Sequence, residues 1–219
     1  YELSSKQNNM SAILTLGYLY EEGFGVKQDY SKAIKYYQLL ANQDNSDALN
    51  CLGIIYLFVE TEKDYLKAKF YLESAAKLNN SKAMCNLGYM HYKGFGVEKN
   101  YLKAKEYFEL SAEQSNRFAY IYLAELYEFG FGVKQDYLKA KEYLEKAAKA
   151  NDPYAFEKLG YFYINGYGVE QNFLIAKDYF ELSIRSYNPS ANFILADFFS
   201  NGFIFEIDYF KAIQYLMKS

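Results

Sequence analysis

The sequence predicts an all-α fold made of about six repeats, each a pair of antiparallel helices. Two regularities carry the prediction. An alanine recurs every 35 or 36 residues, at Ala12, Ala48, Ala83, Ala119, Ala155 and Ala191. A leucine follows each alanine by four residues, and an aromatic side chain or His91 follows it by eight. All thirteen glycines fall at two recurring motif positions, so one unit of about 36 residues is repeated along the 219-residue chain.

The first helix of each repeat, helix A, is expected between the anchor alanine and the glycine that begins the next turn. The alanine, leucine and ring stand at offsets 0, 4 and 8, which place them on one helical face, and offset 7 adds another apolar residue. Offset 5 is always small: it holds Gly17, Gly53, Gly88, Ala124, Gly160 and Ala196. Because glycine lowers helix propensity, we expect a neighbouring helix to cross closely at this position.

Helix A is expected to end at the first glycine of a Gly-x-Gly-Val step, since glycine readily adopts the left-handed conformation that closes a helix. These steps begin at Gly23, Gly94, Gly130 and Gly166. The second helix, helix B, is expected to start after a residue that caps helix N-termini well. The capping residues are Asp29, Asp64, Asn100, Asp136, Asn172 and Asp208. Helix B carries an apolar face of its own, and its lysines are expected on the solvated face.

Two turns and both ends of the chain depart from the repeat. The second repeat runs from Leu57 to Lys63 without a glycine, and the sixth reads Gly202 to Phe205. Residues 1–11 align with the end of a helix B, and the chain stops at Ser219 without a polar capping helix. We therefore expect residues 1–219 to form a single solenoid, a piece of a longer protein, with repeats that begin near residues 12, 48, 83, 119, 155 and 191.

Composition excludes several classes of partner. The formal net charge is −3 and the isoelectric point is near 5.4, with charges well mixed, which gives no footprint for nucleic acid or anionic lipid. No apolar run approaches the roughly 20 residues of a membrane helix, and no secretory signal is present.

Cys51 and Cys85 stand at different repeat offsets and are expected to be reduced. We expect a cytoplasmic protein, with the endoplasmic-reticulum lumen or secretion as the alternative.

The repeat resembles the Sel-one-like repeat, a branch of the tetratricopeptide-repeat superfamily. The first repeat carries the motif almost whole, from Ala12, Leu16 and Gly17 through Gly23 and Gly25 to Asp29, Tyr30, Lys32 and Ala33. The resemblance covers essentially the entire chain. It implies a right-handed α-solenoid that serves as a scaffold, an adaptor or a peptide-binding surface. Relatives range from adaptors of degradation complexes to bacterial regulators and host-interaction factors, so the fold does not name the partner.

No residue pattern indicates catalysis, a metal or a cofactor. Gly-x-Gly occurs in phosphate-binding loops, but here it follows a helix and lacks the third glycine, which favours a helix cap. His91 is the only histidine and stands where other repeats place tyrosine or phenylalanine, so we expect a packed ring rather than a metal ligand or a general base. We therefore expect no enzymatic activity in this chain and no bound cofactor.

A second stripe of helix A is the candidate partner site. By the family resemblance, offsets −1, 2, 6, 9 and 10 face the concave groove, and helical periodicity separates them from the core offsets. We call these positions the helix A stripe. It varies between repeats and is rich in tyrosine and aliphatic residues, which indicates an interaction surface. The alternative is that some of these side chains cover contacts between helices. The candidate residues are Tyr18, Ile54, Tyr89, Tyr92, Ile121, Glu125, Glu128, Glu157, Tyr161 and Phe193.

Three functions compete at this point. The leading hypothesis is a non-enzymatic scaffold or adaptor that binds a peptide or partner helix, with tyrosines as anchors and Glu125, Glu128 and Glu157 selecting a basic or polar element. The alternative is an architectural or regulatory segment of a larger enzyme, such as a kinase or a ubiquitin-ligase complex. Helical-repeat RNA binding is third, and the acidic balance counts against it. The expected partner is a protein or peptide, without nucleic acid or membrane insertion, and no oligomeric state is predicted.

Overall fold

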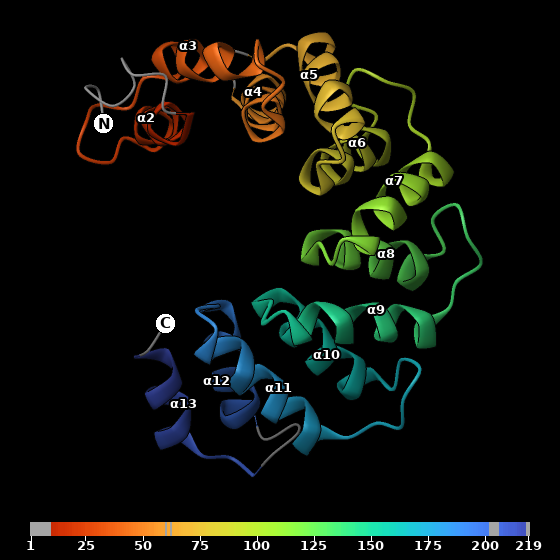
Figure 1. Ribbon diagram of the computed structural model, residues 1–219. Helices are drawn as coiled ribbons and strands as arrows, with labels where there is room; N and C mark the ends of the chain where they lie inside the picture. The colour runs from red at the N-terminus through yellow and green to blue at the C-terminus, as the bar shows by residue number, and fades with distance from the viewer. Residues whose placement is uncertain (1–9, 60, 62, 202–205, 218–219) are drawn as a thin grey trace. The chain divides into compact units, whose positions relative to one another are not determined.

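The computed structural model describes residues 10–59, 61, 63–201 and 206–217, which form helices joined by short connections (Figure 1). The chain divides into two compact units, Tyr1–Asn116 and Arg117–Ser219. The first unit contains α2 (Met10–Glu22), α3 (Tyr30–Ala41), α4 (Ser46–Phe58), α5 (Tyr65–Lys77), α6 (Ser81–Lys93) and α7 (Tyr101–Glu113). The second contains α8 (Arg117–Phe129), α9 (Tyr137–Lys149), α10 (Pro153–Asn165), α11 (Phe173–Arg185), α12 (Ser190–Asn201) and α13 (Tyr209–Leu216). The described residues include no strand, and the all-α class is confirmed.

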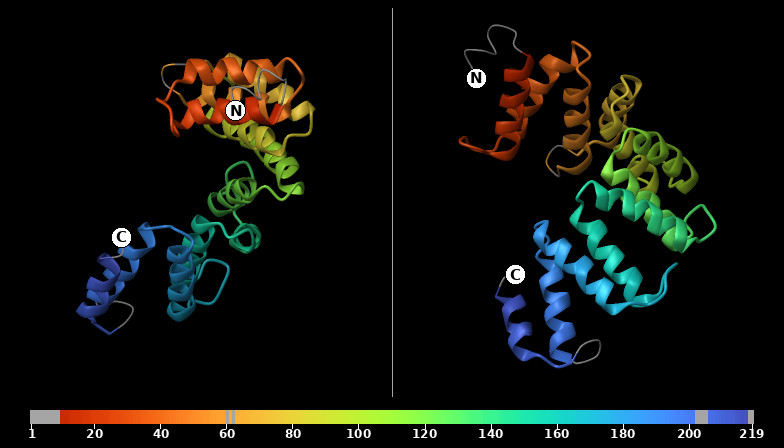
Figure 2. Two further views of the ribbon diagram at one scale, coloured as in Figure 1. Left: turned by 60° about the vertical axis from the view of Figure 1, so that its left-hand side comes forward. Right: turned by 60° about the horizontal axis from the view of Figure 1, so that its bottom comes forward.

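The even-numbered helices are helix A of each repeat and the odd-numbered helices are helix B. Consecutive helices run antiparallel, as the views of Figure 2 show for both units. Within each unit, a helix A packs most closely against the helix B of its own repeat. In the first unit α4 also contacts α6, so helix A of one repeat touches helix A of the next.

The core follows the predicted offsets. All six anchor alanines are buried, and so are the six leucines that follow them. The side chain at offset 8 stacks on a helix B tyrosine in every repeat, with ring centroids 5.6 to 5.9 Å apart. His91 follows the same rule, since its ring lies parallel to Tyr107 at 5.8 Å, and the prediction of a packed ring is confirmed. Cys51 and Cys85 are free thiols.

The turns also form as predicted where the glycine step is present. Gly23, Gly94, Gly130 and Gly166 have φ angles between 70° and 79°, in the left-handed region. All six predicted Asp or Asn residues cap a helix B through a side-chain oxygen that accepts a backbone N–H. The backbone N–H of each cap also donates to the carbonyl of the residue at offset 8 in helix A. These bonds fix helix B against the end of helix A.

The second and sixth repeats keep this connection without a complete glycine step. In the second repeat α4 ends at Phe58, its C-cap Val59 is extended, and the Asp64 N–H still donates to the Tyr56 carbonyl at 2.8 Å. Residues 60 and 62 of that turn lie outside the described residues, as does the turn from Gly202 to Phe205. Of residues 1–11, only Met10 and Ser11 are described, and both belong to α2.

Candidate functional site

The ten candidate residues of the helix A stripe differ in exposure. Three are exposed: Tyr18 at 48%, Tyr161 at 37% and Phe193 at 57%. Five are half-buried: Ile54, Tyr89, Tyr92, Glu125 and Glu157. Ile121 and Glu128 are buried, each at 8%. The stripe therefore combines accessible anchors with side chains that mainly pack within the fold.

An open hollow of about 340 Å³ lies on the stripe of the first unit. Helices α2, α4 and α6 supply most of its lining, and α3 contributes the ring of Tyr37. Five of its eight lining residues stand at stripe positions, and the others are Thr15, Cys51 and Tyr37. The five stripe residues are Leu14, Tyr18, Asp47, Asn50 and Lys82. Three consecutive repeats thus converge on one concavity of side-chain size.

A partly buried hydrogen bond holds the Tyr37 side chain in the wall of this hollow. The Tyr37 hydroxyl donates to Glu21 Oε2 at 2.6 Å. Burial is the main cause that raises the pKa of Glu21, and the hydrogen bond from Tyr37 opposes it. Burial raises the pKa of the Tyr37 hydroxyl, and the neighbouring Cys51 and Glu21 raise it further. Burial, together with the Glu21 carboxylate, raises the pKa of the Cys51 thiol to about 12. The Cys51 thiol is therefore a neutral wall group, not an activated nucleophile.

The stripe tyrosines of the third repeat are held by neighbouring rings. Tyr89 lies 5.7 Å from Phe58 and 5.9 Å from Phe95 between ring centroids. Tyr92 meets Tyr101 edge-on at 5.5 Å, and the Lys93 ammonium lies 5.1 Å from the centre of the Tyr92 ring. These contacts hold the rings in place before binding. Less side-chain conformational entropy is therefore lost when a partner binds.

In the second unit, stripe carboxylates link successive A helices. Both carboxylate oxygens of Glu128 on α8 accept from Lys158 Nζ on α10, at 3.1 and 3.3 Å, which explains the burial of Glu128. Glu157 accepts from Asn188 Nδ2 at 2.5 Å and from the Ser190 hydroxyl at 2.6 Å. The Tyr154 hydroxyl lies 3.4 Å from Glu125 Oε1, at the outer limit of a hydrogen bond. Sequence reasoning missed Lys158, which stands at offset 3, just outside the stripe.

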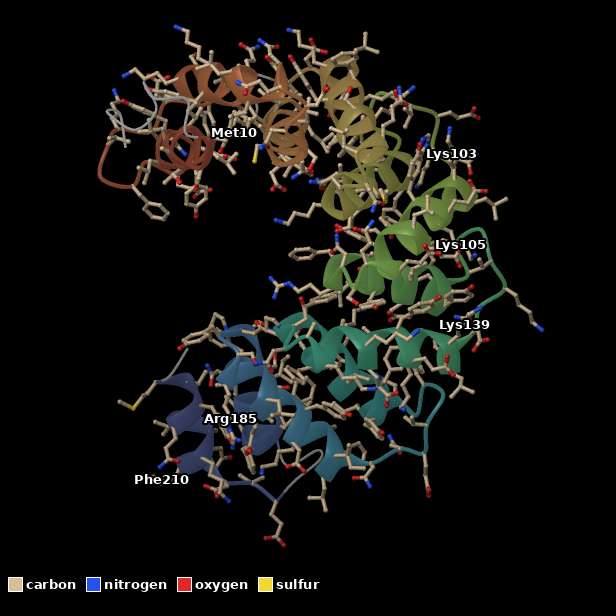
Figure 3. The ribbon with its side chains drawn as sticks, viewed as in Figure 1. Met10, Lys103, Lys105, Lys139, Arg185 and Phe210 are labelled. Atoms are coloured by element: carbon tan, nitrogen blue, oxygen red, sulfur yellow. The ribbon has the colours of Figure 1, made fainter. Side chains whose placement is uncertain are left out.

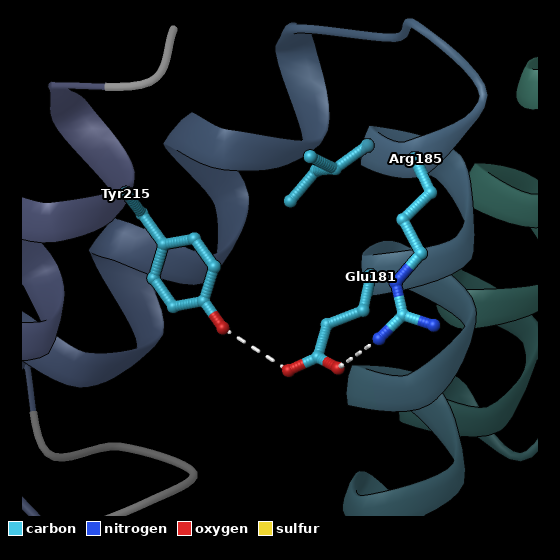
Figure 4. A pocket seen from close by; sticks show the side chains of 4 residues that line it. Glu181, Arg185 and Tyr215 are labelled. Atoms are coloured by element: carbon cyan, nitrogen blue, oxygen red, sulfur yellow. Dashed lines mark hydrogen bonds and ion pairs between the residues drawn. The ribbon is translucent and has the colours of Figure 1, made fainter.

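A smaller hollow, of about 280 Å³, lies between α11 and α13 (Figure 4). The Tyr215 hydroxyl donates to Glu181 at 3.1 Å, and Arg185 lies 3.8 Å from the other Glu181 oxygen. Tyr215 and Arg185 thus each contact one oxygen of the Glu181 carboxylate. Because α11 and α13 are both B helices, no candidate residue of the helix A stripe lines this hollow. Within the described residues, no group of His, Cys, Asp and Glu side chains has the arrangement of a metal site. No described helix has the length and apolar character needed to cross a membrane.

Comparisons with known proteins agree with this architecture. No curated protein gave a significant match to the sequence. Among solved structures, a Sel1 repeat protein from Oxalobacter formigenes is 28% identical with a TM-score of 0.83, over 97% of this chain and 85% of that one. A protective antigen of uropathogenic Escherichia coli strains, which displays an SLR fold, is 26% identical with a TM-score of 0.77. That match covers 98% of this chain and 46% of the antigen, so this chain spans less than half the antigen's length.

An immunity protein from Pseudomonas aeruginosa shares the fold at 22% identity, with a TM-score of 0.63 over 85% of this chain and 72% of that one. The model of the Sel1 repeat matches this chain six times, at residues 11–45, 46–80, 81–116, 117–152, 154–188 and 189–219. Six matches in register cover nearly the whole sequence. The chain therefore belongs to the Sel1 repeat family.

Proposed function

We propose that this chain is a non-enzymatic interaction module that binds a peptide or a partner helix along its helix A stripe. Sel1 repeat proteins are generally scaffolds for protein interactions, and the family is typically non-enzymatic. The observation that carries the proposal is the hollow on α2, α4 and α6, because most of its lining comes from stripe positions. It combines apolar surface from Leu14 and Tyr18 with polar groups of Asp47, Asn50 and Lys82.

The hollow has the properties of a site for one partner side chain. Tyr18 is 48% exposed at its rim and provides a rigid aromatic anchor. Asn50 is 4% exposed and accepts from Asn86 Nδ2 at 3.0 Å, so its side chain is fixed before a partner arrives. A preformed concavity with few, fixed polar groups is typical of a recognition site.

Selection from a random 12-residue peptide library on the immobilised chain tests the proposal. We expect peptides whose affinity falls about tenfold or more in Tyr18→Ala, since loss of an aromatic anchor commonly costs this much. Leu66→Ala is the matched control, because Leu66 is 76% exposed on α5, a helix B of the same unit. Selected peptides that are insensitive to every stripe substitution would contradict the proposal.

A second candidate function is favoured by a row of exposed side chains on the B helices of each unit, taken by itself. Leu66, Leu102, Leu138, Leu174 and Phe210 occupy the same repeat position and are 58% to 76% exposed. Figure 3 labels Phe210, and also Lys103 and Lys139, which directly follow two of these leucines. Such a row supports docking through the helix B edge, as an architectural or regulatory segment would use. This alternative would be favoured if the selected peptides lost affinity for Leu66→Ala and kept their full affinity for Tyr18→Ala.

A further inference from the structure

The helix A stripe of the second unit has a one-sided chemistry. Its positions on α8, α10 and α12 hold five aromatic residues, Phe118, Phe129, Tyr154, Tyr161 and Phe193, all at least 37% exposed. They also hold four acidic residues, Glu125, Glu128, Glu157 and Asp197, and neither lysine nor arginine. The stripe of the first unit differs, because Lys82 and Lys93 stand among its acidic residues.

Two cations of the chain itself lie against this surface and show what it attracts. The Lys158 ammonium pairs with Glu128 at 3.1 Å and lies 5.5 Å from the centre of the Phe129 ring and 5.8 Å from that of Tyr154. The Arg117 guanidinium lies 4.8 Å from the ring centre of Phe118, a stripe residue, and pairs at 3.5 Å with Asp152, the N-cap of α10 beside the stripe. Each cation thus meets one carboxylate and at least one aromatic face, the combination that stabilises a positive charge.

Glu157 and Asp197, two of the four stripe carboxylates, take no part in these two ion pairs. Among the described residues, Glu157 accepts hydrogen bonds from two neutral groups, the amide of Asn188 and the hydroxyl of Ser190, which add no positive charge beside it. Asp197 accepts from the neutral amide of Asn201 at 2.6 Å. Burial is the main cause that raises the pKa of Tyr154, and the Glu125, Glu128 and Glu157 carboxylates raise it further. Three carboxylates therefore act on one point of the surface.

This charge distribution decides between possible occupants. A purely apolar helix would cover carboxylates without pairing them, which costs free energy for each buried charge. An acidic segment or a nucleic-acid backbone would be repelled. Lysine and arginine side chains would pair with the carboxylates and lie over the rings, while their aliphatic stems cover apolar surface.

We propose that the helix A stripe of the second unit docks a basic peptide segment, whose lysine or arginine side chains lie between the exposed aromatic rings and the Glu157 and Asp197 carboxylates. This inference rests on the proposed function and names the partner chemistry for one part of that surface. The rings provide contact area, and the carboxylates select the sign of the charge and favour rapid association.

The test uses the full chain and the same random 12-residue peptide library. We expect enriched peptides to contain lysine and arginine above their frequency in the library. A synthetic copy of the strongest binder should lose about tenfold or more in affinity for Glu157→Gln/Asp197→Asn, because both substitutions keep the shape and remove the charge. Its affinity should also fall when its arginines are replaced by citrulline, and when salt rises from 50 to 300 mM.

Glu142→Gln is the matched control, because Glu142 is exposed on α9, a helix B of the same unit, and its substitution removes one charge away from the stripe. It should leave the affinity within about twofold, and melting curves should show that every variant is folded. Equal loss in the control would reduce the effect to overall charge and overturn the inference. Enrichment of neutral or acidic peptides that depend on Tyr18 would overturn the inference alone and leave the proposed function standing. Enrichment of no peptide at all would overturn both.

Discussion

The ring of Phe108 on α7 occupies the space where a side chain of Gly88 on α6 would stand. A Cβ atom added to Gly88 would lie 2.6 Å from two carbons of that ring, well inside van der Waals contact. The same relationship joins Gly17 to Tyr37 and Gly160 to Phe180. The close helix crossing predicted at offset 5 is therefore confirmed, and its cause is a helix B side chain that packs directly on the helix A backbone.

We expect Gly88→Ala to lower the free energy of unfolding by up to about 2 kcal/mol. Overpacking a core costs roughly 1–3 kcal/mol, and alanine recovers nearly 1 kcal/mol of helix propensity. Thermal melting followed by circular dichroism measures the change. Gly88→Ala/Phe108→Leu should recover part of the loss, because the fourth repeat places Ala124 and Leu144 at the equivalent positions of its buried core. A higher melting temperature in Gly88→Ala would contradict the role assigned to Phe108.

The turn after α8 gives a prediction about backbone conformation. Gly130 has a φ angle of 71°, which a β-branched residue strongly resists. Gly130→Val should therefore destabilise the chain by at least about 1–2 kcal/mol, whereas Gly130→Asn should cost less, since asparagine tolerates this region. Melting curves of the two variants, compared at the same pH, decide the point. Identical curves for Gly130→Val and the parent would contradict the assigned role of the glycine.

The cap of the following helix can be tested separately. Asp136 accepts the Lys139 N–H at 3.0 Å, and Asp136→Ala should cost about 1 kcal/mol through the loss of this bond. Asp136→Asn keeps the acceptor and should retain most of the stability, which separates the hydrogen bond from the charge. The measurement is again thermal melting, and a larger loss in Asp136→Asn than in Asp136→Ala would argue against capping.

Much of the fold could be predicted because helix caps and core offsets are local signals. The glycine turns, the six helix B caps and the buried alanines each follow from residue type and spacing within one repeat. The connections from helix B to the next helix A were not predicted, although each contains a residue other than glycine with positive φ. These residues are Asp44, Asn79, Ser115, Asn151 and Tyr187. Asparagine or aspartate at three of the five was an available signal, but Ser115 and Tyr187 carry no such mark.

The candidate site was less predictable, since exposure depends on contacts between repeats. Periodicity placed Glu128 on the stripe, but only the position of Lys158 on the next helix A explains why Glu128 is buried. Ile121 is buried for a similar reason, because it joins the core cluster that includes Tyr127 and Phe162. Tyr37, which lines the hollow of the first unit, belongs to a helix B and lies outside any stripe of helix A.

His91 makes stability depend on pH in a way that a tyrosine would not. Burial and the nearby Lys103 ammonium lower the pKa of His91 below its ordinary value. The unfolded chain therefore binds this proton more readily than the folded chain. The neutral ring contributes its full stability above about pH 6.5, and this contribution is lost as the pH falls through the lowered pKa.

We therefore expect His91→Tyr to melt at a higher temperature than the parent, with a difference that grows between pH 7.5 and pH 5. Other repeats support the substitution, since Lys32, Lys67 and Lys139 lie 4.4 to 5.1 Å from the ring centres of the tyrosines at this offset. Such a contact contributes about 0.5–1 kcal/mol at an exposed site. The comparison of the two proteins at each pH cancels the titration of all other groups. A constant difference across this range would show that His91 does not titrate with folding.

Stripe and core tyrosines should separate in their effects on stability. Tyr127 is 6% exposed and stacks on Tyr143 at 5.9 Å, so Tyr127→Ala should cost roughly 3–5 kcal/mol, as for other buried aromatic residues. Tyr161 is 37% exposed and meets Phe180 edge-on at 5.4 Å, and Tyr89 is half-buried against two rings. Tyr161→Ala and Tyr89→Ala should each cost less than half as much, because their rings lose only part of their contacts with the protein.

Thermal melting of the three variants measures the difference, and library-selected peptides measure binding by the folded variants. Equal destabilisation by all three would place Tyr89 and Tyr161 in the core, whereas unchanged stability and unchanged peptide affinity would move the binding surface off this stripe.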